Sequence, residues 1–231
     1  MARGDALLFE HLAVRASQEV YEEILRENPG EYEALWRCSR GSLALAILEE
    51  EWAQKLELFD QGVSYARRAL EVRHDDEEAL YWLAASLGRW AQKEMDSRKA
   101  LELAGEVRRT AERLLEMNPD HAGAHNVLGM FHFEVLRKSR VERMLGGLLA
   151  PSTLRGVTWE EASMHLSRAA ALDSQSVLYH RDYAEALLWR GDKPAARRVL
   201  DEAILLPLIL PTDGKFMREV GELRHRAGMG G

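Results

Sequence analysis

Residues 114–126 read LLEMNPDHAGAHN, and similar stretches occur at three other places in the chain. They are ILRENPGEYEALW at 24–36, ALEVRHDDEEALY at 69–81 and AAALDSQSVLYHR at 169–181. Each joins the end of one apolar, helix-like run to the start of the next through a polar turn, and successive copies begin 45, 45 and 55 residues apart. Self-similarity at a regular spacing indicates stacked helical pairs. We therefore expect turns near Pro29, Asp75, Pro119, Ser174 and Gly191.

The residue pattern predicts an all-α protein. Ala, Leu, Glu and Arg are abundant, and no segment alternates Val, Ile or Thr with polar residues as a half-buried strand does. We expect a single right-handed α-α superhelix of about four helix pairs plus a terminal helix, as one domain over residues 1–231. The predicted repeats lie near 17–44, 60–92, 105–135 and 159–206, with an insert at 136–158.

The last repeat carries the features that identify the repeat type. A fifth helix end, AILLP at 203–207, follows the fourth after 34 residues. Tyr183-Ala184 lies in the first helix, Gly191-Asp192 at the turn, and Ala196, Leu200 and Ala203 in the second helix. This stretch resembles the tetratricopeptide repeat, whose period is about 34 residues. The 45-residue intervals add about three helical turns to each earlier pair.

A more specific resemblance covers about residues 20–225. EALWRCSRG, EALYWLAASLG, AERLLEMNPDHAGAHNVLGMFHFEV, WEEASMHLSRAAALD and RGDKPAARRVLDEAILLP together resemble the regulator of microtubule dynamics protein family. The most specific parts are Trp36-Arg37, Leu128-Gly129 and the AILLP ending; Met130-Phe131 stands where the family pattern has Arg-Trp. The resemblance implies a tetratricopeptide-like interaction domain. For some eukaryotic members it implies association with microtubules or with organelle membranes and lipids.

Composition excludes several classes of function. The formal net charge of -7 argues against nucleic-acid binding, which needs clustered positive charge. One cysteine, Cys38, cannot form an intrachain disulfide. No long apolar run predicts a signal peptide or a membrane span, so we expect a soluble, cytoplasmic protein.

Three histidines raise the hypothesis of a metal site. His121, His125 and His132 share one face of a helix. The competing interpretation is structural: His125 occupies the same repeat position as Leu35, Leu80 and His180, which faces the partner helix, and His121 lies in a polar turn. We favour the structural interpretation and expect neither a metal nor another cofactor.

No set of residues predicts catalysis. Cys38 falls at a packing position, and no nucleophile elbow or phosphate-binding loop is present. The carboxylate pairs Asp75-Asp76 and Glu160-Glu161 stand at helix starts, where they complement the helix dipole. We therefore expect a protein that is not an enzyme.

The insert combines basic and apolar residues. Arg137, Lys138, Arg140 and Arg143 precede or flank Met144, Leu145, Leu148 and Leu149. Such a segment could contact an anionic membrane or a partner helix. The alternative that we favour is a short helix and loop that cover the seam between repeats.

A helical solenoid presents a concave groove lined by its first helices. Alignment of the repeats puts Trp36, Tyr81, Asn126 and Arg181 at one groove-facing position. Aromatic and arginine side chains are frequent binding anchors, so we expect a protein or peptide ligand, or alternatively a lipid or other apolar ligand. The alternative for Trp36 and Tyr81 is packing on the next repeat. The candidate binding residues are Trp36, Arg40, Tyr81, Arg89, Asn126, Met130, Phe133, Arg181 and Trp189.

Overall fold

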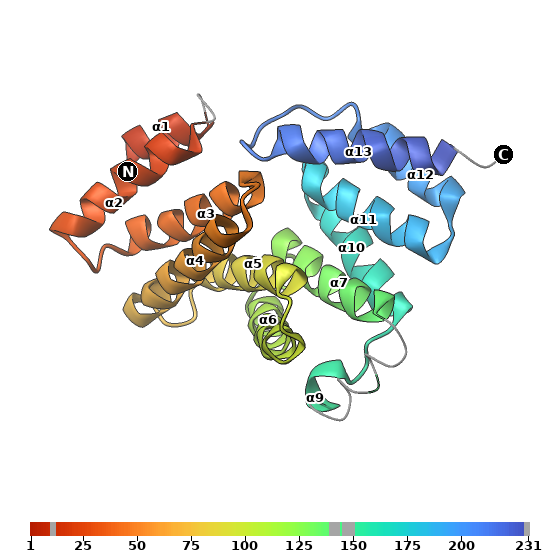
Figure 1. The fold of residues 1–231 in the computed structure, drawn as a ribbon, viewed down its shortest axis with the longest axis horizontal. Helices are drawn as coiled ribbons and strands as arrows, with labels where there is room; N and C mark the ends of the chain where they lie inside the picture. The colour runs from red at the N-terminus through yellow and green to blue at the C-terminus, as the bar shows by residue number, and fades with distance from the viewer. Residues whose placement is uncertain (10–12, 139–143, 145–150, 229–231) are drawn as a thin grey trace. The chain divides into compact units, whose positions relative to one another are not determined.

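The structure is a computed structural model that describes residues 1–9, 13–138, 144 and 151–228 (Figure 1). Within these ranges the chain is helical apart from its turns and connections and contains no strand, which confirms the all-α class. The helices are α1 (Ala2–Phe9), α2 (Val14–Glu27), α3 (Tyr32–Leu48), α4 (Trp52–Val72), α5 (Glu77–Lys93), α6 (Ser97–Met117), α7 (Ala122–Arg137), α9 (Pro151–Leu154), α10 (Trp159–Leu172), α11 (Val177–Arg190), α12 (Lys193–Ala203) and α13 (Asp213–Gly228).

The predicted turns are confirmed. Helices α3, α5, α7 and α11 each begin at the same point of the recurring stretch, just after its polar turn. The last prediction, at Gly191, coincides with the C-cap of α11, where the backbone is left-handed with φ of 91°. Glycine adopts this conformation without strain, and so it ends the helix cleanly. The repeated sequence pattern therefore gives the positions of the helix starts directly.

Longer second helices account for the longer interval between the early repeats. Helices α4 and α6 have 21 residues each, whereas α12 has 11. The difference of about three turns confirms the expectation drawn from the 45-residue intervals.

The chain forms two compact units, each described here by itself. Unit 1 consists of Met1–Thr110 with Ile209–Thr212, and unit 2 consists of Ala111–Leu208 with Asp213–Gly231. In unit 1, α3 packs against α2, α4 and α5. In unit 2, α10 packs against α7 and α11, and α13 packs against α11 and α12. The single domain over 1–231 and its four repeat boundaries stay predictions.

The core of unit 1 follows the recurring stretch. Leu35 and Ala69 are fully buried in one cluster with Tyr21, Leu25 and Cys38. Leu35 and Leu80 hold the position that was predicted to face the partner helix, and both are buried. The small Ala69 side chain fills the seam between α4 and its neighbours.

In unit 2, Gly129 brings α7 close to α10. A Cβ atom at Gly129 would lie 2.6 Å from Cγ of Leu166 and 3.0 Å from its backbone nitrogen. Real Cβ atoms essentially never lie as close as 2.6 Å to another carbon, so a larger residue at 129 would force Leu166 to shift. Phe133, one turn further along α7, is then fully buried with Leu166 and Ala162. The Leu128-Gly129 pair thus sets the spacing between two helices.

Side-chain caps fix the starts of several helices. Asp76 accepts a hydrogen bond from the backbone N–H of Glu78, and Ser176 accepts one from Tyr179. Thr158 accepts one from Glu161. These bonds satisfy N–H groups that a helix start leaves without a partner inside the helix.

Candidate binding site

The four residues predicted to share a groove-facing position hold equivalent places in the structure. Trp36, Tyr81, Asn126 and Arg181 are each the fifth residue of their helix, in α3, α5, α7 and α11. Their exposure differs: Trp36 and Asn126 are buried, whereas Tyr81 and Arg181 are partly exposed. One repeat position therefore serves different purposes in successive repeats.

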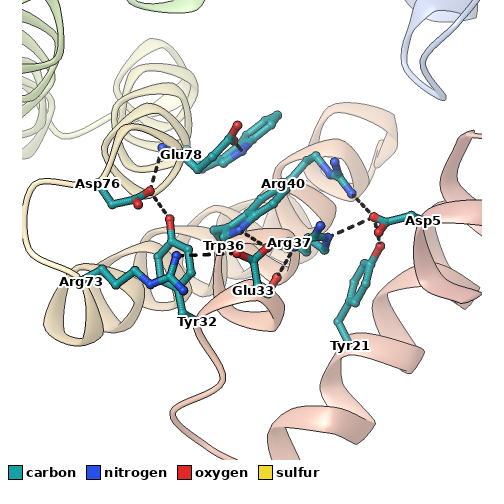
Figure 2. Close-up of polar contacts among 11 residues, drawn as sticks. Asp5, Tyr21, Tyr32, Glu33, Trp36, Arg37, Arg40, Arg73, Asp76 and Glu78 are labelled. Atoms are coloured by element: carbon teal, nitrogen blue, oxygen red, sulfur yellow. Dashed lines mark hydrogen bonds and ion pairs between the residues drawn. The ribbon is translucent and has the colours of Figure 1, made fainter. Parts of the chain in front are cut away.

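In unit 1, two guanidinium groups lie close to the Trp36 ring (Figure 2). The Arg37 guanidinium lies 4.1 Å from the centre of the indole ring and that of Arg40 lies 5.1 Å from it. The indole N–H donates to Oε2 of Glu33 over 3.2 Å. A tryptophan face attracts cations, so this stack stabilises both arginine side chains. Trp36 is 9% exposed, so most of its surface is already used within unit 1.

The two arginines are held by a carboxylate from the first helix. Figure 2 shows Tyr21, Arg37 and Arg40 converging on Asp5 of α1. The Tyr21 hydroxyl donates a hydrogen bond to Oδ1 of Asp5 over 2.7 Å, and Nε of Arg37 donates one to the same oxygen over 3.0 Å. Arg40 forms an ion pair with this oxygen at 3.4 Å. Burial alone would raise the pKa of Asp5, but these hydrogen bonds and the two positive charges lower it. Arg37, half of the pair that marks the family resemblance, thus ties α1 to α3.

A second polar link joins the starts of α3 and α5 (Figure 2). The Tyr32 hydroxyl donates to Oδ1 of Asp76, the residue that caps α5. The Arg73 guanidinium lies 3.9 Å from the Tyr32 ring centre and 3.7 Å from a Glu33 oxygen. Burial and the bond to Asp76 raise the pKa of Tyr32. The phenol therefore stays protonated and keeps donating.

Tyr81 and Arg89 present part of their side chains at the surface of α5. The rings of Tyr81 and Trp82 lie 4.7 Å apart. Arg89 donates to the side-chain oxygen of Gln92 over 3.2 Å. Like Arg40, both residues are partly exposed, in contrast with the buried Trp36.

In unit 2, Arg181 is the centre of an ion cluster. Its guanidinium lies 2.7 Å from Asp182, 2.8 Å from Glu185 and 2.8 Å from Glu219 of α13. Burial alone would lower the pKa of Arg181, but the three carboxylates raise it. Asn126 donates to the other oxygen of Asp182 over 3.1 Å. Because Asp182 is fully buried, Arg181 and Asn126 are needed to hold that carboxylate.

The apolar candidates of unit 2 range from fully buried to half-exposed. Phe133 is fully buried and Met130 is 5% exposed. Measured between ring centres, Trp159 lies 6.1 Å from Phe133 and stacks on Trp189 at 6.0 Å. Trp189 is 52% exposed. Trp189 is therefore the accessible aromatic end of this row.

Sequence reasoning missed Asp5, Trp159 and Asp182. Asp5 precedes the first recurring stretch, and its partners lie 16 to 35 residues away. Trp159 lies at a helix start, outside the aligned first-helix positions. Asp182 is an acidic residue next to a predicted site residue, and a buried carboxylate cannot be recognised from sequence without its partners. The Arg181-Asp182 adjacency was the available signal.

The histidines separate into different roles. His121 caps α7, since its Nδ1 accepts from the backbone N–H of Ala124 over 3.0 Å. His125 is buried, as its repeat position predicts, and its Nδ1 lies 2.8 Å from Nδ1 of His165 on α10. Burial and the neighbouring His125 lower the pKa of His165 to about 4. His165 is thus neutral at neutral pH.

Cys38 has the environment of a packing residue. It is fully buried in the core of unit 1, and this burial raises the pKa of its thiol. A thiol that resists ionisation is a poor nucleophile.

The predicted insert at 136–158 is only partly described. Arg140, Arg143, Leu145, Leu148 and Leu149 lie outside the described residues. Met144 is 61% exposed. Arg137 pairs with Glu134 at 3.1 Å and with Glu185 at 3.5 Å. In the described ranges, no helix combines the length and apolar character needed to cross a bilayer.

A pocket of about 420 Å³ lies between α1 and α2. Its walls are Arg3, Leu7, Ala16, Glu19, Val20, Glu23 and Arg26. None of the predicted binding residues lines it, so it is separate from the expected first-helix surface.

Solved structures identify the class of fold. The structure resembles the crystal structure of a thermophilic TPR protein from Thermus thermophilus with a TM-score of 0.61. The two share 17% sequence identity, and the match covers 91% of this chain and 90% of that one. Together with the helical pairs described above, this likeness defines a tetratricopeptide-like helical-repeat protein.

The family model of regulator of microtubule dynamics proteins 1–3 matches residues 2–227, and the chain belongs to this family. Regulator of microtubule dynamics protein 1 of Caenorhabditis elegans is 21% identical over 227 residues, which are 97% of this chain and 98% of that protein. Protein 3 of Bos taurus is 25% identical over 190 residues, 82% of this chain. The match covers 40% of the length of that bovine relative.

Proposed function

We propose that this chain is a non-catalytic helical-repeat scaffold that binds a protein or peptide partner through the surface of its first helices. The observation that carries the proposal is that a fold of stacked helical pairs presents partly exposed aromatic and arginine side chains on these helices. They are Tyr81 and Arg89 on α5 and Trp189 at the end of α11. Such side chains dominate binding energy at interfaces because they bury a large area and make several polar contacts.

The accessible residues suggest the chemistry of the partner. In unit 1, Tyr81 would bury apolar ligand surface and Arg89 would donate charge-assisted hydrogen bonds to a carboxylate. In unit 2, Trp189 would bury apolar ligand surface. Arg40 and Arg181, also candidates, already pair with carboxylates of the chain. In unit 1, a partner segment with an acidic residue beside an apolar one fits Tyr81 and Arg89. In unit 2, an apolar partner side chain fits Trp189.

Site-specific photocrosslinking tests this proposal directly. A photoreactive phenylalanine analogue placed at 81 or at 189 should crosslink a defined protein in cells, identified by mass spectrometry. The matched control is position 52, because Trp52 is 39% exposed but begins the second helix α4. The same products from position 52 as from 81 and 189 would contradict a first-helix binding surface.

The affinity of the identified partner can then be measured with alanine variants. Tyr81→Ala or Trp189→Ala should weaken binding by about 2 kcal/mol if either is a hot spot. Trp52→Ala should leave the affinity unchanged. Equal melting temperatures of the variants establish that the loss concerns binding and not folding.

The name of the family suggests microtubules as one protein partner to test. Co-sedimentation with polymerised tubulin gives the answer: the chain should pellet with the polymer, and Trp189→Ala should pellet less. A chain that stays in the supernatant at every tubulin concentration would remove microtubules as a direct partner, without affecting binding to other proteins.

Binding of a lipid or another apolar ligand is the alternative. Two exposed apolar side chains favour it: Leu205, after α12, is 83% exposed and Met144 in the insert is 61% exposed. Ile204 and Leu208, close to Leu205 in the chain, are also exposed, and contiguous exposed apolar surface often marks a contact site. Native mass spectrometry of the purified chain distinguishes this alternative, because a retained lipid adds its mass to the protein. A spectrum of the bare chain alone argues against it.

A further inference from the structure

Two histidines and one carboxylate of unit 2 converge at the α7–α10 crossing. His132 comes from α7, while Glu161 and His165 lie one turn apart on α10. Each offers one ligand atom, and these three atoms lie within 4.8 Å of one another. His132 and His165 are buried, with their rings stacked at 6.1 Å between centres, and Glu161 reaches the surface. The cluster thus lies partly in the core, and solvent can reach it at Glu161.

The hydrogen bonds of His125 fix the tautomer of His165. Nε2 of His125 lies 2.9 Å from the carbonyl oxygen of Pro119, which can only accept, so this nitrogen carries the proton. A histidine ring with its proton on Nε2 accepts at Nδ1. The partner of the His125 Nδ1 at 2.8 Å, Nδ1 of His165, must donate. The neutral His165 ring therefore keeps its lone pair on Nε2.

That lone pair faces a negative charge. Nε2 of His165 lies 3.6 Å from Oε2 of Glu161, so two electron-rich atoms oppose each other at the mouth of the cluster. A cation between them would turn this repulsion into attraction. Histidine Nδ1 donating to a second group, with Nε2 left for a metal, is the usual arrangement around metal-bound histidines. Here His125 and the Pro119 carbonyl provide that outer support.

We propose that His132, His165 and Glu161 bind a divalent first-row transition-metal ion such as Zn²⁺. Two imidazoles and one carboxylate form a common zinc ligand set, with water in the fourth position. Ligand atoms around tetrahedral zinc stand about 3.3 Å apart, given bonds of about 2.0–2.1 Å. The distance of 3.6 Å between Nε2 of His165 and Oε2 of Glu161 is close to this value. Because the Glu161 side chain is exposed, it can move to bring its carboxylate to the distance from the two histidines that zinc requires. Imidazole ligands favour such ions over Mg²⁺ or Ca²⁺.

This set differs from the one that the sequence suggested. Of His121, His125 and His132, only His132 belongs to it. His121 is occupied as a helix cap and His125 supports His165 from behind. The other two ligands come from a helix about 30 residues further along the chain, beyond the insert. The site is independent of the proposed partner-binding surface.

Calorimetric titration with Zn²⁺ tests the proposal on the full chain, prepared without a polyhistidine tag and stripped with a chelator. We expect saturable binding of one ion per chain and a higher melting temperature with zinc. Glu161→Gln keeps the shape but removes the charge, and should weaken binding at least tenfold. Glu160→Gln is the matched control, because Glu160 is also exposed in the first turn of α10 and should leave the affinity unchanged.

Co²⁺ provides a second readout that does not depend on stability. A tetrahedral site with two histidines should give strong visible absorption, which His132→Gln should abolish. If His132→Gln fails to fold, the Glu161→Gln and Glu160→Gln pair still decides the question. Absence of saturable zinc binding, or equal zinc affinity in these two variants, would overturn the proposal.

Discussion

Gly129 shows how one residue controls the distance between two helices. Its missing side chain lets the backbone of α7 approach Leu166 on α10. The histidines of the proposed metal site lie within a turn of this contact on both helices. A sequence alone cannot distinguish such a glycine from one that merely tolerates a helix, because the difference lies in what faces it.

We expect Gly129→Ala to destabilise unit 2. The added methyl group would overlap Leu166 and force a repacking that costs about 1–3 kcal/mol. This outweighs the gain of up to about 1 kcal/mol that alanine brings to a helix interior. Gly221→Ala in α13 is the control, because its Cβ would meet nothing within 4 Å. Chemical denaturation measures the free energy of unfolding of both variants. If Gly129→Ala were as stable as the native chain or more stable, this would contradict the close contact described between α7 and α10.

Asp5 is predicted to make the docking of α1 depend on pH. Its pKa is lower in the folded chain than the ordinary value of about 3.9 in unfolded chains. The Asp5 contacts therefore contribute their full stability above that ordinary value, and lose it as the pH falls through the lowered, folded pKa. The melting temperature of the native chain should fall in this acid range more steeply than that of Asp5→Asn.

Thermal melts followed by circular dichroism between neutral and acid pH measure this difference. Asp60→Asn, at an exposed position of α4, serves as the control and should keep the native pH profile. Asp5→Asn should also melt lower at neutral pH, because Arg37 and Arg40 lose a charged acceptor. Identical pH profiles for Asp5→Asn and the native chain would disprove the role given to this carboxylate.

At the scale of helices, the repeated sequence pattern was sufficient to predict where most of the first helices begin. The polar turns and the apolar residues that flank them recur, so the starts of α3, α5, α7 and α11 could be predicted within a residue or two. The small residues at the seams, Ala69 and Ala203, could be placed by the same alignment, and both are fully buried. Helices α1 and α2 were harder to divide, because the N-terminal part has no earlier copy with which to align.

A bulky residue at the seam should disrupt helix packing. Ala69→Trp or Ala203→Trp should cost about 1–3 kcal/mol, because the core around each alanine has no space for an indole. Glu160→Ala, on the exposed side of α10, should cost well under that. Urea denaturation of the three variants provides the comparison. Similar losses in all three would show that the seam positions are wrongly assigned.

At the scale of the whole chain, sequence reasoning reached the fold and only part of the candidate site. Repetition predicts which residues hold equivalent places, but not which of them stay exposed: Trp36 and Asn126 are buried, whereas Tyr81 is partly exposed. The missing information is long-range pairing. Asp5 meets Arg37 and Arg181 meets Glu219 across tens of residues, and no local pattern records such partners.

The thiol of Cys38 should report the unfolding of unit 1. It is fully buried and its pKa is raised, so both access and ionisation oppose its reaction. A thiol-specific reagent at mildly alkaline pH should modify the native chain much more slowly than the chain unfolded in concentrated urea. The rate should rise with urea in parallel with the loss of helical signal. Rapid labelling without denaturant would show that this part of the core opens locally.

The buried carboxylate of Asp182 limits how this chain can be rearranged. It belongs to a network that joins three helices: it binds Asn126 of α7 and Arg181 of α11, and Arg181 in turn pairs with Glu219 of α13. A copy of α11 grafted onto another repeat would carry its buried negative charge without Asn126 or Glu219. The repeats that contain α7, α11 and α13 are therefore not exchangeable modules, and recombination or duplication must move them as one block.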